Sequence, residues 1–343
     1  MKPIDESDLE EILEPLEDAE RELGRSRVLI TGGTGFFGTW LLESWAHNSD
    51  RLALERTAVV VTRDPEAFAA RMPHLALHRS IELIRGDVLG PNPVHGSFDA
   101  CLHAATAASL ALTQSDPRLM FDTIVDGTRN VLDWVRPSGR IPTVFTSSGA
   151  VYGALDPNIE GVPETTLTGP DPLDSTAVYA EAKRAAEMLC VIETATGQDI
   201  RVARCFAFVG PHLPLDAHFA VGNFIADGLA GRPIVIHGDG TPVRSYMYGT
   251  DLVIWLRTLL ARGVAGRAYN VGSEDGRSLA EIARLVGDRC GVDVVVRSES
   301  TRSGPSHRYV PSTERARAEL GVKETVPLDE ALRRTIEWNR LIT

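Results

Sequence analysis

Residues 28–45 read VLITGGTGFFGTWLLESW and decide the fold of this 343-residue chain. An apolar run ends in a stretch with glycine at every third position, and a second apolar run begins directly after it. This order predicts a buried strand, a tight turn and a helix, and the glycines would let the backbone approach a pyrophosphate. Free N–H groups at the start of the helix would stabilise the phosphate charge. The residues expected to bind phosphate are Gly32, Gly35, Phe36, Phe37 and Gly38.

Short apolar runs continue to alternate with longer helical stretches after residue 38. Alternation of this kind is typical of βαβ units, and right-handed crossovers then give a doubly wound parallel sheet. We therefore expect an α/β protein with a dinucleotide-binding domain at residues 27–206, to which part of 244–272 returns. The strands predicted for this sheet are 28–31, 58–62, 81–85, 100–103, 143–147 and 200–206.

The chain changes texture after Gly210, where prolines and glycines become frequent. We expect residues 207–243 and 273–343 to form a smaller C-terminal α/β lobe, with a substrate bound between the two parts. The elements predicted there are strands at 234–237 and 294–297 and helices at 278–289 and 328–339.

Residues 1–26 form an acidic N-terminal extension with apolar residues at helical spacing from 7 to 23. We expect an amphipathic helix lying on the surface of the domain. Ser7 is the expected N-cap, Pro15 is expected to interrupt or kink the helix, and Gly24 is expected to end it.

The composition excludes several kinds of partner. The net charge is −12, and the chain lacks the clustered Lys and Arg that drive nucleic-acid binding. No apolar stretch is long enough to span a membrane and the N-terminus carries no targeting signal, so we expect a cytoplasmic protein without a membrane partner. The four cysteines are far apart, and His74 and His78 have no third ligand at a suitable spacing. We therefore predict reduced thiols and no metal site.

The tip of the second predicted strand reads Thr62-Arg63-Asp64, where the adenosine ribose of a dinucleotide would lie. An acid here accepts a hydrogen bond from the ribose 2′-hydroxyl of NAD, whereas an arginine suits the 2′-phosphate of NADP. Because Arg63 comes first, the sequence favours NADP(H) and leaves NAD open.

Two further loops follow predicted strands at the same edge of the sheet. Asp87 and Val88 follow the third strand, where the carboxylate would either reach an adenine amine or serve only as a solvated turn residue. Ala104 and Ala105 follow the fourth strand, and their small side chains would let a nicotinamide ribose approach the backbone. All four are among the expected cofactor contacts.

Tyr179 and Lys183 lie one turn apart on a predicted helix, so that their side chains share a face. An ammonium near a phenol stabilises the phenolate and lowers its pKa, which makes the tyrosine a proton acceptor for an alcohol. A Ser-Ser loop after the fifth strand would place a hydroxyl beside it, with Ser148 as our choice and Ser147 as the alternative. The expected catalytic residues are Ser148, Tyr179 and Lys183.

Six motifs, taken in order, resemble the extended short-chain dehydrogenase/reductase family, and specifically its nucleotide-sugar epimerase and dehydratase branch. They are residues 31–38, 147–153, 179–183, 204–211, 238–251 and 269–272. The resemblance implies a Rossmann-type fold, an NAD(P) cofactor and a nucleotide-diphosphate sugar as substrate. It further implies that Tyr179 takes a proton from a sugar hydroxyl, commonly at C4, while hydride passes to the nicotinamide, and that Tyr179 and Lys183 both contact the cofactor.

The resemblance also implies substrate contacts. Besides Ser148 and Gly149 in the loop, Asn223 would touch the diphosphate, and Arg244 and Arg308 would be its charged clamps. Two positions depart from the family pattern, because Ala207 replaces a common asparagine and Ser312 replaces a common aspartate.

The loop after Ser148 narrows the choice of reaction. Relatives that eliminate water or decarboxylate usually carry Asp or Glu there, whereas this chain has Gly149 and Ala150. We therefore predict an epimerase, with an NADPH-dependent keto-sugar reductase as the alternative and a 4,6-dehydratase third, unless another acid such as Glu164 enters the site. A cofactor-sensing binding protein is the non-enzymatic alternative. The resemblance further suggests a homodimer formed through helices at 116–135 and 179–194, while the sugar and the base stay open.

Overall fold

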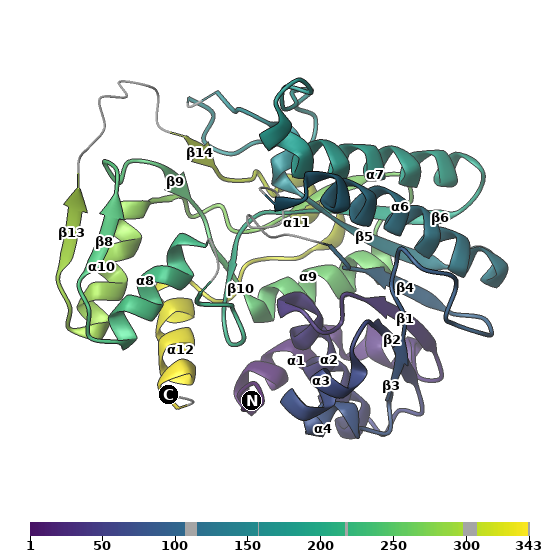
Figure 1. Ribbon diagram of the computed structural model, residues 1–343. Coiled ribbons are helices and arrows are strands. Elements are labelled where there is room, and N and C mark those ends of the chain that lie inside the picture. Colours follow the sequence, from purple (N-terminus) through teal and green to yellow (C-terminus); the bar gives the residue numbers. More distant parts are fainter. Residues whose placement is uncertain (107–114, 157, 217–218, 298–306, 342–343) are drawn as a thin grey trace.

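A computed structural model describes residues 1–106, 115–156, 158–216, 219–297 and 307–341. Its centre is a parallel seven-stranded sheet in the order β11-β6-β5-β4-β1-β2-β3 (Figure 1). The predicted α/β, doubly wound fold is thereby confirmed. The strands are β1 (Arg27–Thr31), β2 (Thr57–Thr62), β3 (Ile81–Arg85), β4 (Ala100–His103), β5 (Pro142–Ser148), β6 (Asp199–Cys205) and β11 (Ala268–Val271).

The chain reverses its direction across the sheet between β1 and β4, which pair with each other although β2 and β3 lie between them in sequence. Such a switch point leaves a crevice at the carboxyl ends of the strands, where open α/β sheets bind ligands. The predicted phosphate turn follows β1, and the Ser-Ser loop is at the end of β5. Both therefore lie at the same edge.

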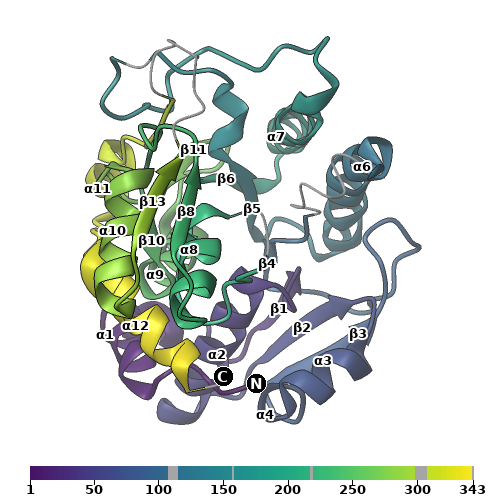
Figure 2. The ribbon, with the colours of Figure 1, turned by 60° about the vertical axis from the view of Figure 1, so that its left-hand side comes forward.

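Helices cover both faces of the sheet (Figure 2). One face packs against α1 (Glu6–Glu22), α2 (Phe36–Arg51) and α9 (Gly249–Arg262), and the other against α6 (Pro117–Val135) and α7 (Val178–Ala195). Alternate strand residues serve the two faces, since Val28 and Ile30 belong to one apolar cluster and Leu29 to another. The short helices α3 (Pro65–Arg71) and α4 (Pro73–Ala76) connect β2 to β3.

A smaller α/β lobe contains most of the C-terminal elements and lies to one side of the sheet (Figure 1). Its parallel pair β8–β13 packs against α8 and α10. The elements are β7 (Phe208–Val209), α8 (Ala220–Leu229), β8 (Ile234–His237), β9 (Val243–Arg244), β10 (Met247–Tyr248), β12 (Arg277–Ser278), α10 (Leu279–Cys290), β13 (Val294–Arg297), β14 (Arg308–Tyr309) and α12 (Leu328–Arg340). The helix α11 (Glu314–Leu320) follows β14 in sequence but packs against β11 of the main sheet and against α9.

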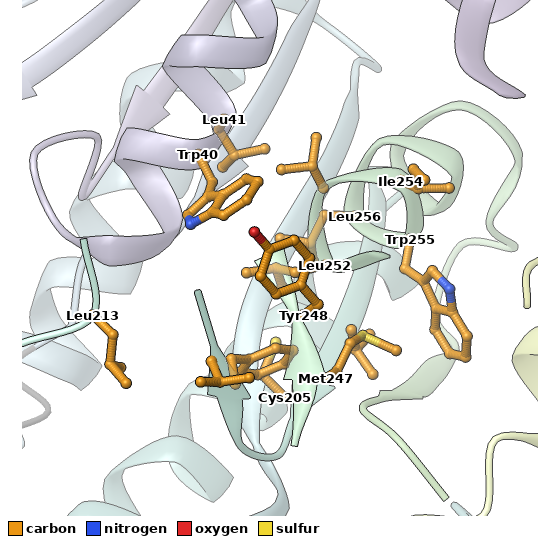
Figure 3. Packing of buried hydrophobic residues seen from close by; sticks show 14 of the residues in the cluster. Trp40, Leu41, Cys205, Leu213, Met247, Tyr248, Leu252, Ile254, Trp255 and Leu256 are labelled. Carbon is orange, nitrogen blue, oxygen red and sulfur yellow. The ribbon is translucent and has the colours of Figure 1, made fainter. Parts of the chain in front are cut away.

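The apolar core continues from the sheet into this lobe. Trp40 of α2 packs edge-on against Tyr248, with ring centroids 5.3 Å apart, and Leu252 of α9 lies beside them (Figure 3). Because these side chains come from distant parts of the sequence, they fix α2 and α9 against each other on one face of the sheet.

The N-terminal helix differs from its prediction in two details. Asp5, not Ser7, caps it, because the Asp5 carboxylate accepts a hydrogen bond from the Ser7 backbone N–H. The helix also runs through Pro15, which lies on the exposed face where water can hydrate the carbonyl that the proline leaves without a donor. Its apolar face is buried against α2 and α9, so the extension is an integral layer of the fold.

Candidate active site at the carboxyl edge of the sheet

The turn after β1 has the geometry of a phosphate cradle. Gly32 has a φ of +71°, and a Cβ there would lie 2.5 Å from the Ala104 carbonyl and 2.6 Å from the Ala105 nitrogen. A Cβ on Gly38 would lie 2.3 Å from the backbone of the turn itself, whereas Gly35 has room around it and is exposed. Two glycines thus permit the close approach of chain segments, and the third leaves the backbone open to a ligand.

Phe36 and Phe37 begin α2, and the N-cap Gly35 offers no side chain to their N–H groups. The Phe37 ring packs at 4.9 Å against Phe208, so the side chains anchor the helix while the first N–H groups of the helix have no capping side chain. An uncapped helix start carries partial positive charge. A dinucleotide pyrophosphate therefore fits this turn.

The other predicted cofactor contacts follow β2 and β3. Arg63 is exposed at the tip of β2, and its carbonyl accepts a hydrogen bond from Arg85 at 2.9 Å. The Asp64 carboxylate accepts from the Ala67 N–H at 2.9 Å and so caps α3. Asp87 is half-buried and caps its own turn by accepting from the Leu89 N–H at 3.0 Å. The Asp64 carboxylate is thus already engaged beside the freely exposed arginine.

Val88, the neighbour of Asp87, is buried against Gly127 of α6. Its carbonyl accepts a hydrogen bond from the Asn130 amide at 2.7 Å. Its side chain therefore anchors the loop after β3, and a cofactor would meet the loop through Asp87 and the backbone.

The three predicted catalytic residues come together. Ser148 ends β5 and Tyr179 is the second residue of α7, and the Ser148 hydroxyl interacts with the Tyr179 phenol. The lowered pKa that the sequence predicted for Tyr179 is not found, because burial in the packed site raises it to about 12 and only the bond to Ser148 opposes this rise. Lys183 is buried one turn further along α7, and its Nζ donates to the Thr146 carbonyl at 2.6 Å. The burial lowers the pKa of Lys183 to about 8.

Ser147, the alternative to Ser148, points to the other side of the loop. Its hydroxyl donates to Glu187 of α7 at 2.6 Å, and the same carboxylate accepts from Arg204 at 2.7 Å. Arg204 also donates to the Tyr152 hydroxyl at 3.0 Å. Ser147 therefore belongs to a polar network behind the catalytic loop, and Ser148 is the hydroxyl that faces Tyr179.

Sequence reasoning missed a second phenol at this site, that of Tyr309 in β14. A Cβ on Gly149 would lie 2.7 Å from the Tyr309 hydroxyl, which also interacts with Ser148. The Tyr309 ring packs at 4.7 Å against Phe206, and burial raises the pKa of its hydroxyl. The one available signal was its place next to Arg308 in the sequence.

The two predicted clamps, Arg244 and Arg308, lie on different faces of their strands. β14 runs parallel to β9, and Tyr309 pairs with Arg244, whose guanidinium carbon is 5.7 Å from the tyrosine ring centre. Arg308 instead donates its Nε to the Glu160 carbonyl at 2.6 Å. Because neighbouring strand residues point to opposite faces, only Arg244 is directed to the side of Tyr309.

Asn223 lies on α8, on the wall of a cavity of about 650 Å³ between α8, β8 and the start of α10. The lining is mixed: apolar side chains such as Phe224 and Ile236 alternate with polar ones, and Arg232 is paired with Asp227 at 2.7 Å. Ser148, Tyr179 and Lys183 do not line it. The predicted substrate contacts are therefore spread from the catalytic loop into the smaller lobe.

The two positions that depart from the family pattern, Ala207 and Ser312, are both in ordinary packing environments. Ser312 is half-buried, and its N–H donates to the Val162 carbonyl at 2.9 Å. Ala207 is half-buried against the core, and its carbonyl accepts from the Met247 N–H at 3.0 Å. Glu164, the acid that could have entered the site, instead accepts from the Asn270 N–H at 2.8 Å. Its other oxygen lies 3.9 Å from Arg315, and its side chain is 4% exposed. The Glu164 carboxylate is therefore held in the scaffold.

Comparison with known proteins gives consistent matches. Residues 28–272 match the NAD dependent epimerase/dehydratase family. The chain is 30% identical to UDP-glucuronic acid decarboxylase 1 of Xenopus tropicalis, over 98% of this chain and 81% of that protein. It is 32% identical to UDP-glucuronic acid decarboxylase 3 of Arabidopsis thaliana, over 93% of this chain and 90% of that protein.

Solved structures show the same fold. A UDP-glucose 4-epimerase from Thermotoga maritima, solved with UDP-glucose, has a TM-score of 0.77 at 23% identity and covers 92% of this chain and 99% of its own. A dTDP-glucose 4,6-dehydratase from Streptomyces venezuelae, solved with NAD, has a TM-score of 0.77 at 23% identity, covering 92% and 97%. Among the described residues, no helix is both long and apolar enough to cross a membrane.

Proposed function

The chain belongs to the NAD dependent epimerase/dehydratase family, and on that premise we propose that it epimerises a nucleotide-diphosphate sugar through a transient keto sugar. The observation that carries this proposal is that, in the part of the chain that the structure describes, aromatic groups and no carboxylate lie next to the Ser148–Tyr179 pair. Elimination of water requires a base at the carbon next to the ketone, whereas epimerisation at the oxidised carbon requires only proton and hydride transfer at that carbon.

The space beside Ser148 is occupied by aromatic groups. Gly149 faces the Tyr309 hydroxyl and the Phe206 ring, each within 2.8 Å of where a Cβ would stand. Among the described residues, no Asp or Glu is one of the main influences on the pKa of Tyr179 or of Tyr309. Although the curated relatives are named decarboxylases, the surroundings of Ser148 here support chemistry without an added acid.

The chemistry of this chain's residues follows from their positions. Tyr179 as phenolate would accept the proton of the sugar hydroxyl, while the C–H bond of the same carbon gives up its hydride and a C=O bond forms. Ser148 would hydrogen-bond the reacting oxygen, and the Lys183 ammonium would stabilise the phenolate. Bound NAD(P) would serve as the hydride acceptor. After the keto sugar has rotated in the site, the reduced cofactor would serve as the hydride donor. Return of the hydride to the opposite face of the carbonyl carbon, with the proton passing from Tyr179 to the oxygen, completes the inversion.

A second candidate, an NADPH-dependent keto-sugar reductase, is favoured by the tip of β2. Asp64 is engaged as the cap of α3, while Arg63 beside it is exposed. This arrangement supports NADP(H) over NAD, because a guanidinium binds a 2′-phosphate well. NADPH in turn suits a reaction with net reduction.

Cofactor consumption separates the two candidates. The purified protein is desalted, its nicotinamide content is measured by absorbance and fluorescence, and product formation is followed without added cofactor. An epimerase is expected to retain cofactor or to turn over with catalytic amounts of it. Stoichiometric consumption of added NADPH would overturn the epimerase proposal in favour of the reductase.

The substrate is tested with a panel of UDP-, dTDP-, GDP- and CDP-sugars, with NMR of the products. The panel includes UDP-glucuronic acid, and release of carbon dioxide from it would overturn the proposal. We further propose that Asn223 and Arg244 bind the diphosphate. Asn223→Ala and Arg244→Ala are then expected to raise KM for the sugar nucleotide more than they lower kcat, with Arg262→Ala, a distant surface change at the end of α9, as the control.

We propose a homodimer formed through α6 and α7. Five large apolar side chains on these two helices are 38–59% exposed, although the helices pack against each other and the sheet. Exposed apolar patches of this kind mark interaction surfaces. They are Leu119, Phe121, Met188, Val191 and Ile192. Light scattering during size-exclusion chromatography should give twice the chain mass, and Val191→Glu should shift it toward the monomer.

A further inference from the structure

A buried histidine lies beneath the segments that would hold the cofactor. His103 ends β4 and is 1% exposed. Its Nδ1 lies 2.6 Å from the Thr31 hydroxyl at the end of β1, and its Nε2 lies 3.0 Å from the Thr128 hydroxyl in α6. Both ring nitrogens therefore have a partner, and the ring joins two elements across the sheet.

The available donors and acceptors determine which group donates in each of these hydrogen bonds. The Thr128 hydroxyl donates its one proton to the Ile124 carbonyl at 2.6 Å, so toward His103 it can only accept. The proton of the neutral imidazole must then be on Nε2, which leaves Nδ1 as an acceptor for the Thr31 hydroxyl. Thr31 in turn accepts from the Ala105 N–H at 3.2 Å.

The histidine is neutral over the range in which enzymes work. Burial, with a smaller contribution from the nearby Lys183 ammonium, lowers the pKa of His103 to about 3. A protonated ring would present an N–H to Thr31 at Nδ1 and would remove the acceptor that the Thr31 proton needs. Neutrality is therefore a condition for the contacts seen here.

These contacts hold two loops at a fixed spacing. Ala104 and Ala105 follow His103 directly and lie against Gly32, where even a Cβ would collide with them. The Ala104 N–H donates to the Thr31 carbonyl at 3.1 Å, and the Ala105 N–H donates to the Thr31 hydroxyl. Thr31 is thus bonded to both alanines, and His103 determines the direction in which its hydroxyl points.

We propose that His103 is a positioning residue for the cofactor, which fixes the end of β4 against the phosphate turn through Thr31 without touching the cofactor itself. The proposal rests on the proposed role of Gly32, Ala104 and Ala105 in binding NAD(P). It assigns function to the Nδ1 side of the ring, because that side is bonded through the Thr31 hydroxyl to the loop that holds Ala104 and Ala105. The Nε2 side leads to α6 and contributes stability.

Two near-isosteric substitutions separate the sides of the ring. His103→Asn places an amide oxygen close to the position of Nδ1 and keeps the acceptor for Thr31. His103→Gln places its amide close to Nε2 and keeps the contact with Thr128 alone. We expect His103→Gln to weaken NADPH binding roughly tenfold, as for a buried donor that loses its acceptor, and His103→Asn to change it less than about threefold. Binding is measured by fluorescence titration of NADPH, and the melting temperature of each variant is recorded.

Controls separate positioning from loss of stability. His78, whose Nδ1 lies 2.8 Å from the Ser80 hydroxyl, receives the same two substitutions and should bind NADPH normally. If His103→Gln fails to fold, Thr31→Val and Thr31→Ser test the same bond, with weakened binding expected only for valine. Equal loss of affinity in His103→Asn and His103→Gln, or normal affinity in Thr31→Val, would overturn the proposal.

The outcome is also distinguishable from failure of the proposed function. Tyr179→Phe is assayed for turnover alone, so unchanged turnover in that variant would refute the catalytic assignment and leave the NADPH affinities of the His103 variants standing. If the wild type bound neither NADH nor NADPH, the cofactor assignment itself would fail.

Discussion

The cofactor side and the substrate side of this site differ in how their parts are brought together. The phosphate turn is one continuous segment, Gly32 to Gly38, held by its own backbone and by the end of β4. The substrate side joins Ser148, Arg244 and Tyr309, which come from three strands and are more than 60 residues apart. The first depends on local backbone geometry, and the second depends on the register of distant strands.

This difference between the cofactor side and the substrate side indicates where amino-acid substitutions should be tolerated. A turn held by backbone contacts accepts few residues other than glycine, because even a Cβ atom would collide with other main-chain atoms. A site built from side chains can change its partners while the fold stays intact. We therefore expect substitutions on the cofactor side to affect folding and binding together, and substitutions on the substrate side to affect turnover with little change in stability.

The largest effect is expected for Tyr179→Phe, which removes the proton acceptor. General acid–base groups contribute about 10²- to 10⁴-fold, so kcat should fall by roughly 10³-fold while the melting temperature changes little. Steady-state assays on the substrate identified by the panel measure this. Tyr269→Phe is the matched control, because its buried hydroxyl bonds Glu319 away from the site. An equal loss in both variants would contradict the assignment.

The next largest effect is expected for Gly38→Ala, where the Cβ would lie 2.3 Å from backbone atoms of the turn. Such overpacking typically costs about 1–3 kcal/mol or more in the free energy of unfolding. Chemical denaturation should show this loss together with weaker NADPH binding. Gly35→Ala, where a Cβ has room, should fold normally. If both variants were equally stable, the turn would not be limited by its own backbone.

The buried Lys183 should make both the stability and the activity of the protein depend on pH. Its pKa is lowered from 10.5 to about 8, so the folded protein releases this proton before the unfolded chain does. The cost of burying the charge is present in full below pH 8, and stability from this group rises with pH until about 10.5. Activity should move the other way, falling up to tenfold per pH unit above 8, because the neutral amine no longer stabilises the phenolate.

Lys183→Arg separates the two effects of Lys183. An arginine stays charged throughout this range, so the alkaline fall in kcat should disappear in any residual activity of the variant. The pH–rate profiles of both proteins measure this. An unchanged alkaline limb in the variant would show that another group titrates there.

A smaller effect is expected for Tyr309→Phe, on the substrate side. Ser148 already accepts from the Ala150 N–H at 3.2 Å, and the Tyr309 hydroxyl is a second partner that helps to aim its proton at Tyr179. Loss of this partner should lower kcat about tenfold and leave the melting temperature almost unchanged. The same substitution made in Ser148→Ala should have little further effect, and full additivity would contradict a shared role.

The sequence predicted the strand, turn and helix around Gly32 and Gly38 well for a physical reason. Close backbone contacts require glycine at positions 32 and 38, and a short sequence motif is enough to show this. The apolar pattern also located the ends of the predicted strands to within one or two residues. Tyr179 and Lys183 were found because one helical turn relates them. In each case the information is local.

The rest could not be predicted because it is not local. Tyr309 reaches Ser148 only because β14 pairs with β9, and the hydrophobic periodicity of the sequence does not predict that pairing. Arg308 and Arg244 were both predicted as clamps, and only the strand register shows that their side chains face different ways. Pro15 likewise was expected to break its helix, because the sequence does not show which face is exposed.

The smallest effect is expected for Arg63→Ala, at the exposed edge of the cofactor side. An exposed charge contact contributes up to about 1 kcal/mol, so KM for NADPH should rise no more than about fivefold while KM for NADH stays the same. The ratio of the two constants measures this directly. Arg85→Ala is a demanding control, because Arg85 supports the Arg63 carbonyl without being expected to contact the cofactor. An equal rise for both cofactors would assign Arg63 to the pyrophosphate or to stability, and the preference for NADP(H) would then have to come from other residues.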